Sequence, residues 1–405
     1  MSAIYTMSFS PKVSELFQPP RLRSSRNTND QRHASWLELF YDLVFVAAVA
    51  QLSLLLSHEY SIVGLLHFAA LFVPVWWAWI GNTFYLSRFD ADDVTDRLLT
   101  LGQMMFVASL AVHVPLGLGE HSVGFALSYV GVRALLIAQY RRAGKYLAEA
   151  RPLTFHYVTG FTIAAALWVV STIVPPPFRF VLWAAGIAID FLTPITAGKL
   201  HLKIPPHMSH LPERFGLFTI IVLGEAIIAT VQGATTQSLQ GSGVFIGFFG
   251  LIIAFTLWWG YFDDVNAAEA RPMQTHDDAK SYQVWMYVHL PLTMAITAAA
   301  VGVKHVLNLK PGEYLPAIEG WVFCLSMAVC TSCLNTIFLH APNIARNEHA
   351  RRYLWPHHVV TVSMLFCGMV ASRIAPVLLM ALIAALSMTQ VLLAFRKTPT
   401  SAKKN

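Results

Sequence analysis

Long apolar segments recur along the whole chain, and short polar stretches separate them. A helix needs about 20 apolar residues to cross the hydrocarbon core of a bilayer, so each segment is predicted to span a membrane. No alternating pattern of the kind found in transmembrane strands competes, which argues against a barrel. The predicted spans are Trp36–Ser57, Ser61–Leu86, Leu98–Leu116, Ser122–Arg142, Phe155–Val174, Phe178–Ala197, Leu211–Gln232, Ser242–Asp264, Ser281–Val301, Tyr314–His340, Tyr353–Ala371 and Ile374–Phe395.

The composition supports an all-α polytopic membrane protein with about twelve transmembrane helices. Hydrophobic residues make up 56% of the chain and charged residues 12%. That charged share is about half of the share in soluble domains, so the excess apolar surface must face lipid. The motif Cys330-x-x-Cys333 lacks a second pair of ligands and lies in an apolar run, so its cysteines are interpreted as small core residues.

The basic residues predict the orientation of the spans. With the N-terminus inside, the only basic residues in outer loops are Arg179, Lys304, Lys310 and Arg373, and only Arg133 lies in a span centre. Such a bias places both termini in the cytoplasm. Residues 1–34 are predicted to be a disordered basic tail, and residues 397–405 form a second basic tail. The net charge of +6 thus needs no nucleic-acid partner; the expected partners are membrane lipids and a small solute or ion.

Short sequence matches predict an internal repeat. Glu38-Leu-Phe recurs as Glu213-Arg-Phe, and Val112-His-Val-Pro-Leu recurs as Val288-His-Leu-Pro-Leu, at offsets of 175 and 176 residues. We therefore expect residues 35–205 and 206–396 to form two parallel six-helix repeats about an axis along the membrane normal. The alternative is a duplication that was retained only for packing.

Two of these segments also resemble a known family. The segment WLELFYDLVFV at 36–46 and the segment ERFGLFTIIVLGE at 213–225 are similar to recurrent motifs of the bacterial low temperature requirement A (LtrA) family. The resemblance implies a many-spanning protein of the bacterial cytoplasmic membrane, but it implies no substrate. The acids of the family motifs fall on Glu38, Asp42, Glu213 and Glu225.

Charged side chains inside the predicted spans are the first candidate site residues. A charge at mid-membrane costs about 2.5–3.5 kcal/mol or more, so each one requires a partner or a function. Arg133 is always charged, and its possible partners are Asp190, Glu225 and Asp42. These residues form either a structural ion pair that fixes helix packing or a substrate- or proton-binding site.

Two histidines and two acids complete the candidates. His113 and His289 precede prolines in repeat-related spans, and they either relay protons or make structural hydrogen bonds. Ser35-x-x-Glu38 fits a capping box, and Glu213 follows Pro212 at a helix start, so both acids are interpreted as structural caps. Asp42 lies one turn deeper, where capping does not explain it.

These residues favour a secondary transporter of a small solute or ion, proton-coupled through the buried acids. The alternatives are an intramembrane enzyme that acts on a lipid or another hydrophobic substrate, and a membrane sensor or scaffold. The sequence holds no Walker A motif, no Gly-x-Ser-x-Gly elbow and no zinc-protease motif, so no catalytic residue, metal or cofactor is assigned.

Overall fold

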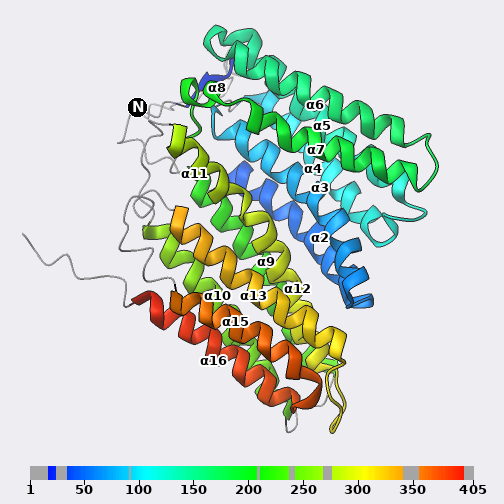
Figure 1. Ribbon diagram of the computed structural model, residues 1–405. Coiled ribbons are helices and arrows are strands. Elements are labelled where there is room, and N and C mark those ends of the chain that lie inside the picture. Colours follow the sequence, from blue (N-terminus) through cyan, green and yellow to red (C-terminus); the bar gives the residue numbers. More distant parts are fainter. Residues whose placement is uncertain are drawn as a thin grey trace, which may run out of the picture.

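The helices lie side by side in two groups, which follow one another along the chain (Figure 1). The computed structural model describes residues 17–23, 34–90, 93–207, 210–236, 242–267, 276–340 and 355–395. Within them, eleven helical segments are long and apolar enough to cross a membrane. The predicted all-α polytopic membrane fold is confirmed.

The first group contains the helices of the N-terminal half. Its long helices are α2 (Trp36–His58), α3 (Ile62–Leu86), α4 (Val94–His113), α5 (Ser122–Tyr146), α6 (Arg151–Ser171) and α7 (Phe178–Thr196). Short elements join or extend them, namely η1 (Val114–Leu116), η2 (Ala148–Ala150) and α8 (Lys199–Lys203).

The second group contains the remaining helices. They are α9 (His210–Thr236), α10 (Ser242–Ala267), α11 (His276–Tyr287), α12 (His289–Leu307), α13 (Ala317–His340), α15 (Trp355–Val370) and α16 (Pro376–Phe395), with η3 (Ala371–Arg373) between the last two. The start of α2 and the end of α16 lie on the same side of the molecule, which we call the N-terminal face (Figure 1).

The predicted span Ser281–Val301 lies within one segment, Lys280–Leu307, that is long and apolar enough to cross a membrane. This span consists of two helices, α11 and α12, that meet at Val288. Pro291 lies in the first turn of α12, where its missing N–H breaks no bond within that helix. Of the span predicted at Tyr353–Ala371, Tyr353 and Leu354 lie outside the described residues, and the described part consists of helix α15 and the first residue of η3.

Part of the predicted N-terminal tail is ordered. Strand β1 (Arg21–Leu22) pairs antiparallel with strand β2 (Phe89–Asp90), which follows α3. The Arg23 amide extends this pairing by donating to the Arg88 carbonyl at 2.8 Å. Residues 17–23 therefore lie against the N-terminal face, unlike the disordered tail expected from the sequence.

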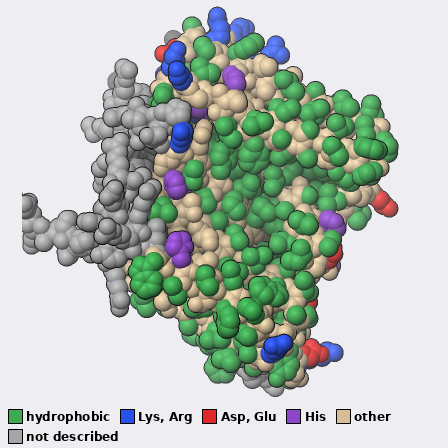
Figure 2. Space-filling view, viewed as in Figure 1, with side chains coloured by type: hydrophobic (Ala, Val, Ile, Leu, Met, Phe, Trp, Pro, Cys, Tyr) green, Lys and Arg blue, Asp and Glu red, His purple; other side chains and the backbone are tan. Residues whose placement is uncertain are grey.

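The outer surface is apolar over most of its area. Figure 2 shows hydrophobic side chains across the face in view, with charged side chains toward its edges. Ile173 is 84% exposed, Phe155 is 70% exposed and Met105 is 68% exposed. An apolar surface of this extent is suited to lipid rather than water.

The two helix groups meet along α2 and α9. Two of their polar contacts, Glu38 with His210 and Asp42 with Arg214, join residues that are 172 positions apart. A constant offset means that the two helices run parallel and in register. At the other end of the contact, Tyr60 donates to the Ala298 carbonyl of α12 at 2.8 Å. We call this contact of α2 and α3 with α9 and α12 the joint.

Candidate functional site

The first turns of α2 present two acids to α9. Ser35 caps the helix, and its hydroxyl accepts a hydrogen bond from the Glu38 amide at 3.3 Å. Glu38 and Asp42 are four residues apart and therefore lie on one helix face. That face is buried in the joint, where Glu38 is 4% exposed and Asp42 is 2% exposed.

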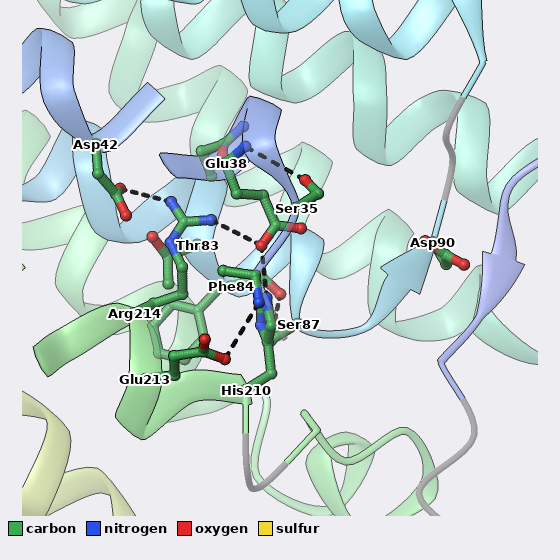
Figure 3. Close-up of polar contacts among 12 residues, drawn as sticks. Ser35, Glu38, Asp42, Thr83, Phe84, Ser87, Asp90, His210, Glu213 and Arg214 are labelled. Carbon is green, nitrogen blue, oxygen red and sulfur yellow. Dashed lines mark hydrogen bonds and ion pairs between the residues drawn. The ribbon is translucent and has the colours of Figure 1, made fainter. Parts of the chain in front are cut away.

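Arg214 of α9 lies between these two acids (Figure 3). One of its terminal nitrogens is 2.6 Å from Asp42 Oδ1 and the other is 3.2 Å from Glu38 Oε2. The Arg214 side chain is completely buried, so its charge depends on these carboxylates for compensation. One guanidinium thus links both acids of the first helix group to the second group.

Asp42 uses only one of its two carboxylate oxygens. Oδ1 accepts from Arg214 and also from the indole nitrogen of Trp79 at 2.7 Å. Oδ2 is buried and has no hydrogen-bond partner among the described residues. A carboxylate oxygen with free lone pairs is a position that a proton can occupy.

The Glu38 carboxylate has more partners than a role in capping the helix would require. Its carboxylate binds His210 Nε2 at 2.6 Å and an Arg23 terminal nitrogen at 2.9 Å, in addition to Arg214. The capping-box prediction is corrected here, because the Glu38 carboxylate serves this buried ion cluster instead of the Ser35 amide. Glu213 accepts from the Ala34 amide at 3.2 Å, which ties the start of α9 to the start of α2.

We call Glu38, Asp42, Arg214, His210 and Arg23 the joint cluster. Two carboxylates face two guanidiniums, so the cluster is neutral when the imidazole is neutral and positive when it is protonated. His210 Nδ1 is buried and has no hydrogen-bond partner among the described residues. The cluster therefore offers two positions for a proton, at this nitrogen and at Asp42 Oδ2.

Arg133 and Asp190 form a separate ion pair inside the first group. An Arg133 terminal nitrogen contacts Asp190 Oδ1, and the Tyr129 hydroxyl donates to Asp190 Oδ2 at 2.6 Å. The guanidinium lies 4.0 Å from the ring centroid of Phe161, and both charged side chains are completely buried. Of the three partners considered for Arg133, the structure selects Asp190.

The absence of a side chain at Gly81 makes room for this pair. A Cβ atom there would lie 2.9 Å from a terminal nitrogen of Arg133 and 2.8 Å from Leu136 Cδ2. Both Asp190 oxygens have partners and two aromatic rings lie beside the guanidinium, whereas Arg133 Nε and one terminal nitrogen have no hydrogen-bond partner among the described residues. The pair is closed on its acid side, because neither Asp190 oxygen is left open to a proton; we call it the closed pair.

The other predicted candidates lie apart from both clusters. Glu225 is half-buried, hydrogen-bonds with Ser53 across the joint and lies near Lys304. His113 is half-buried at the end of α4, and its Nδ1 is 2.7 Å from the Ser109 carbonyl.

His289 differs from His113 in its place on the helix. It is completely buried at the start of α12, with Nδ1 2.7 Å from the Trp285 carbonyl and Nε2 3.1 Å from the Tyr261 hydroxyl. The structure does not bring His113 and His289 together. Among the described residues, no group of three or more His, Cys, Asp or Glu residues is placed to hold a metal ion.

A further buried contact lies outside the membrane-spanning segments, on α8. An Arg88 terminal nitrogen donates to His201 Nδ1 at 2.8 Å, so His201 Nε2 carries the hydrogen and donates to the Pro194 carbonyl at 2.8 Å. Burial, together with the charge of Arg88, lowers the pKa of His201 to about 4. This imidazole is therefore held neutral.

Sequence comparison places the chain in a family. The model of the bacterial low temperature requirement A protein (LtrA) family matches residues 33–395. The chain belongs to the LtrA family. An uncharacterized protein of Rhizobium meliloti (strain 1021) is 30% identical to this LtrA protein over 292 residues, which cover 68% of this chain and 70% of the relative.

Four members of the site escaped the sequence-based prediction, namely Arg214, His210, Trp79 and Arg23. One sequence signal was available for two of them. His210 and Arg214 are four residues apart, the same spacing as Glu38 and Asp42. Two basic positions at the start of one LtrA helix therefore match two acidic positions at the start of another.

Proposed function

We propose that this LtrA protein is a secondary transporter of a small solute or ion that is coupled to protons through the joint cluster. The observation that carries the proposal is the single guanidinium of Arg214, which binds Asp42 and Glu38 across the two helix groups. It leaves Asp42 Oδ2 and His210 Nδ1 open to protons.

Protonation changes the attraction between the helix groups. A charged Asp42 holds Arg214 at 2.6 Å, and this attraction favours a closed joint. A proton on Asp42 Oδ2 removes the negative charge and weakens the contact between α2 and α9. A proton thus has different affinities for the closed and open joint, which is the thermodynamic requirement for coupling.

The distribution of basic residues supports the placement of the protein in the membrane. We place the N-terminal face in the cytoplasm, with the protein in the bacterial cytoplasmic membrane, because the basic residues predominate on that side. The parallel, in-register packing of α2 on α9 supports two parallel repeats, since each is the first long helix of its half.

The decisive experiment measures proton binding in the joint of the reconstituted full chain. Proteoliposomes on a solid-supported membrane receive a step from alkaline to acidic buffer, and the displaced charge is recorded. We expect a transient charge displacement for the wild type and none above background for Asp42→Asn. Glu59→Gln is the control, because it removes a carboxylate whose side chain is 52% exposed outside the joint. An unchanged displacement in Asp42→Asn would exclude the assigned proton site.

A pH sensor is the second candidate function. Arg23, from the ordered N-terminal segment, binds Glu38 at 2.9 Å and so connects the joint cluster to the N-terminal face. A sensor shows charge displacement without turnover. A transporter shows, in addition, sustained proton flux with an entrapped pH dye when a gradient of NaCl or KCl drives exchange. If no sustained flux is seen with any of these salts, the result favours the sensor.

A further inference from the structure

The second helix group contains a small cavity, separate from the joint, that is lined by both polar and apolar side chains. Its volume is 30 Å³, and it lies among α10, α13, α15 and α16. Six polar side chains line it, and each is less than one tenth exposed: Thr256, Thr331, Asn335, His357, Ser387 and Gln390. Buried polar groups inside a membrane protein are costly unless they are paired, so such a concentration requires an explanation.

The hydroxyl groups of this cavity have acceptor capacity to spare. Thr256, Thr331 and Ser387 each donate to a carbonyl of their own helix at 2.8–2.9 Å. The hydroxyl protons are thereby used, while lone pairs on the oxygens remain. Thr256 and Ser387 can therefore accept hydrogen bonds from a ligand, whereas Thr331 Oγ1 also lies 3.0 Å from the Thr361 hydroxyl.

Two amide side chains are only half satisfied. Gln390 Nε2 donates to Asn335 Oδ1 at 2.9 Å. Asn335 Nδ2 and Gln390 Oε1 are buried and have no hydrogen-bond partner among the described residues. Exchanging N and O in both amides reverses the bond but still leaves one N–H group and one carbonyl oxygen free. The two residues line the cavity, and in either assignment they keep one unpaired donor and one unpaired acceptor.

The cavity defines its ligand by charge and by size. No Asp, Glu, Lys or Arg is among its lining residues, so a bound cation would have no compensating carboxylate. A volume of 30 Å³ has room for about two water molecules. We propose that this cavity binds a small uncharged solute of about two or three non-hydrogen atoms that both donates and accepts hydrogen bonds. This proposal is independent of proton coupling in the joint.

Gly260 allows the cavity to be narrowed without disturbing the fold. It lines the cavity, and a Cβ atom there meets only Leu334 Cδ1, at an ordinary 3.6 Å. Gly260→Ala therefore adds one methyl group at the cavity wall. Gly247→Ala is the matched control, because it lies on the same helix and its added Cβ has no atom within 4 Å. Both changes raise helix propensity equally, so only the cavity distinguishes them.

Formamide is the probe, because it is uncharged and has three non-hydrogen atoms with an N–H donor and a carbonyl acceptor. Saturation-transfer NMR of its formyl proton measures binding to the full chain in detergent. We expect saturable binding to the wild type and to Gly247→Ala. In Gly260→Ala the apparent dissociation constant rises by about tenfold or more, because the methyl group displaces a hydrogen-bonded ligand. Equal binding in all three proteins overturns the proposal.

A second variant tests the amides, and added salts test the assigned charge class. Asn335→Leu/Gln390→Leu removes both half-satisfied groups together, so it leaves no orphan amide and is expected to fold and to lose formamide binding.

NaCl and KCl are compared with choline chloride at equal ionic strength. Displacement of formamide by Na⁺ or K⁺, but not by choline, identifies a cation site and overturns the assignment to an uncharged solute.

Discussion

Arg133 and Arg214 are both completely buried, yet their surroundings differ. Arg133 has one carboxylate partner, Asp190, and that partner uses its second oxygen to accept from Tyr129. Arg214 has two carboxylate partners on another helix, and one oxygen of Asp42 stays open. Both arginines keep unpaired nitrogens among the described residues, so the difference lies in the carboxylates: Asp190 uses both oxygens, whereas Asp42 keeps one open.

The position of each arginine explains this difference. The partners of Arg133 lie on α5, α6 and α7, so the pair fixes packing inside the first helix group. Arg214 connects α9 of the second group with α2 of the first, so its contacts depend on how the groups meet. A buried charge located between two bodies can respond to their movement, whereas one sealed within a single body holds its neighbours in place.

The largest expected loss of stability comes from removing one charge of the pair Arg133–Asp190. Asp190→Asn leaves Arg133 buried without a charged partner and should destabilise the fold by about 3–5 kcal/mol. Asp42→Asn should cost less, because Glu38 remains 3.2 Å from Arg214. Thermal unfolding in detergent compares the two variants.

The double variant Arg133→Met/Asp190→Leu is the control for this comparison. It removes both charges and should restore most of the stability, since apolar replacements of a buried ion pair are often neutral. The contrast between the clusters fails if Asp190→Asn is no less stable than Asp42→Asn.

A loss of stability of intermediate size is expected when the pH falls, and His201 is its expected cause. Its pKa is about 4 in the folded chain and about 6.5 when unfolded. As the pH falls from about 6.5 to about 4, the unfolded chain binds a proton that the folded chain excludes. Stability should therefore decrease by up to about 3 kcal/mol over this window and should not depend on His201 above it.

His201→Gln separates this response from that of the joint. Glutamine retains an acceptor for Arg88 and a donor for the Pro194 carbonyl, but it does not titrate. Urea or thermal unfolding as a function of pH should show a flatter acid limb in His201→Gln. His67→Gln, at a half-exposed histidine, is the control and should match the wild type. An acid limb that is equally steep in His201→Gln would remove His201 as its cause.

The sequence predicted the helical membrane fold because long apolar segments have few alternative structures. It also predicted that Arg133 needs a buried acid, since an arginine cannot lose its charge. Asp190 was one of three candidates. The choice among them required the packing of α5 against its neighbours, which no pattern along one helix contains.

The joint cluster was only partly predictable. The sequence singles out Asp42 because capping does not explain it, but Arg214 lies near the start of its span, where a basic residue needs no partner to be expected. Glu38 fitted a local capping box, and the tertiary contacts with His210 and Arg214 use its carboxylate instead. The amides of the cavity, Asn335 and Gln390, are 55 residues apart and meet only in the folded chain.

The smallest expected effect concerns the ordered N-terminal segment. The Arg23 side chain is 11% exposed and contacts Glu38 at 2.9 Å, while Asp90 lies 3.8 Å away. Arg23→Gln should lower the stability of the whole chain by less than about 1 kcal/mol, because Glu38 keeps His210 and Arg214. Hydrogen exchange should nevertheless become faster in residues 17–23, since the strand pairing alone is short.

Arg21→Gln is the matched control, because it removes the same charge from an exposed side chain of the same segment. If Arg23 belongs to the joint cluster, only Arg23→Gln accelerates exchange in residues 17–23. Amides around Arg133 should exchange at wild-type rates in both variants, because the closed pair shares no residue with the joint cluster. Equal acceleration in both variants would show that general charge attraction, rather than the Glu38 contact, holds this segment on the N-terminal face.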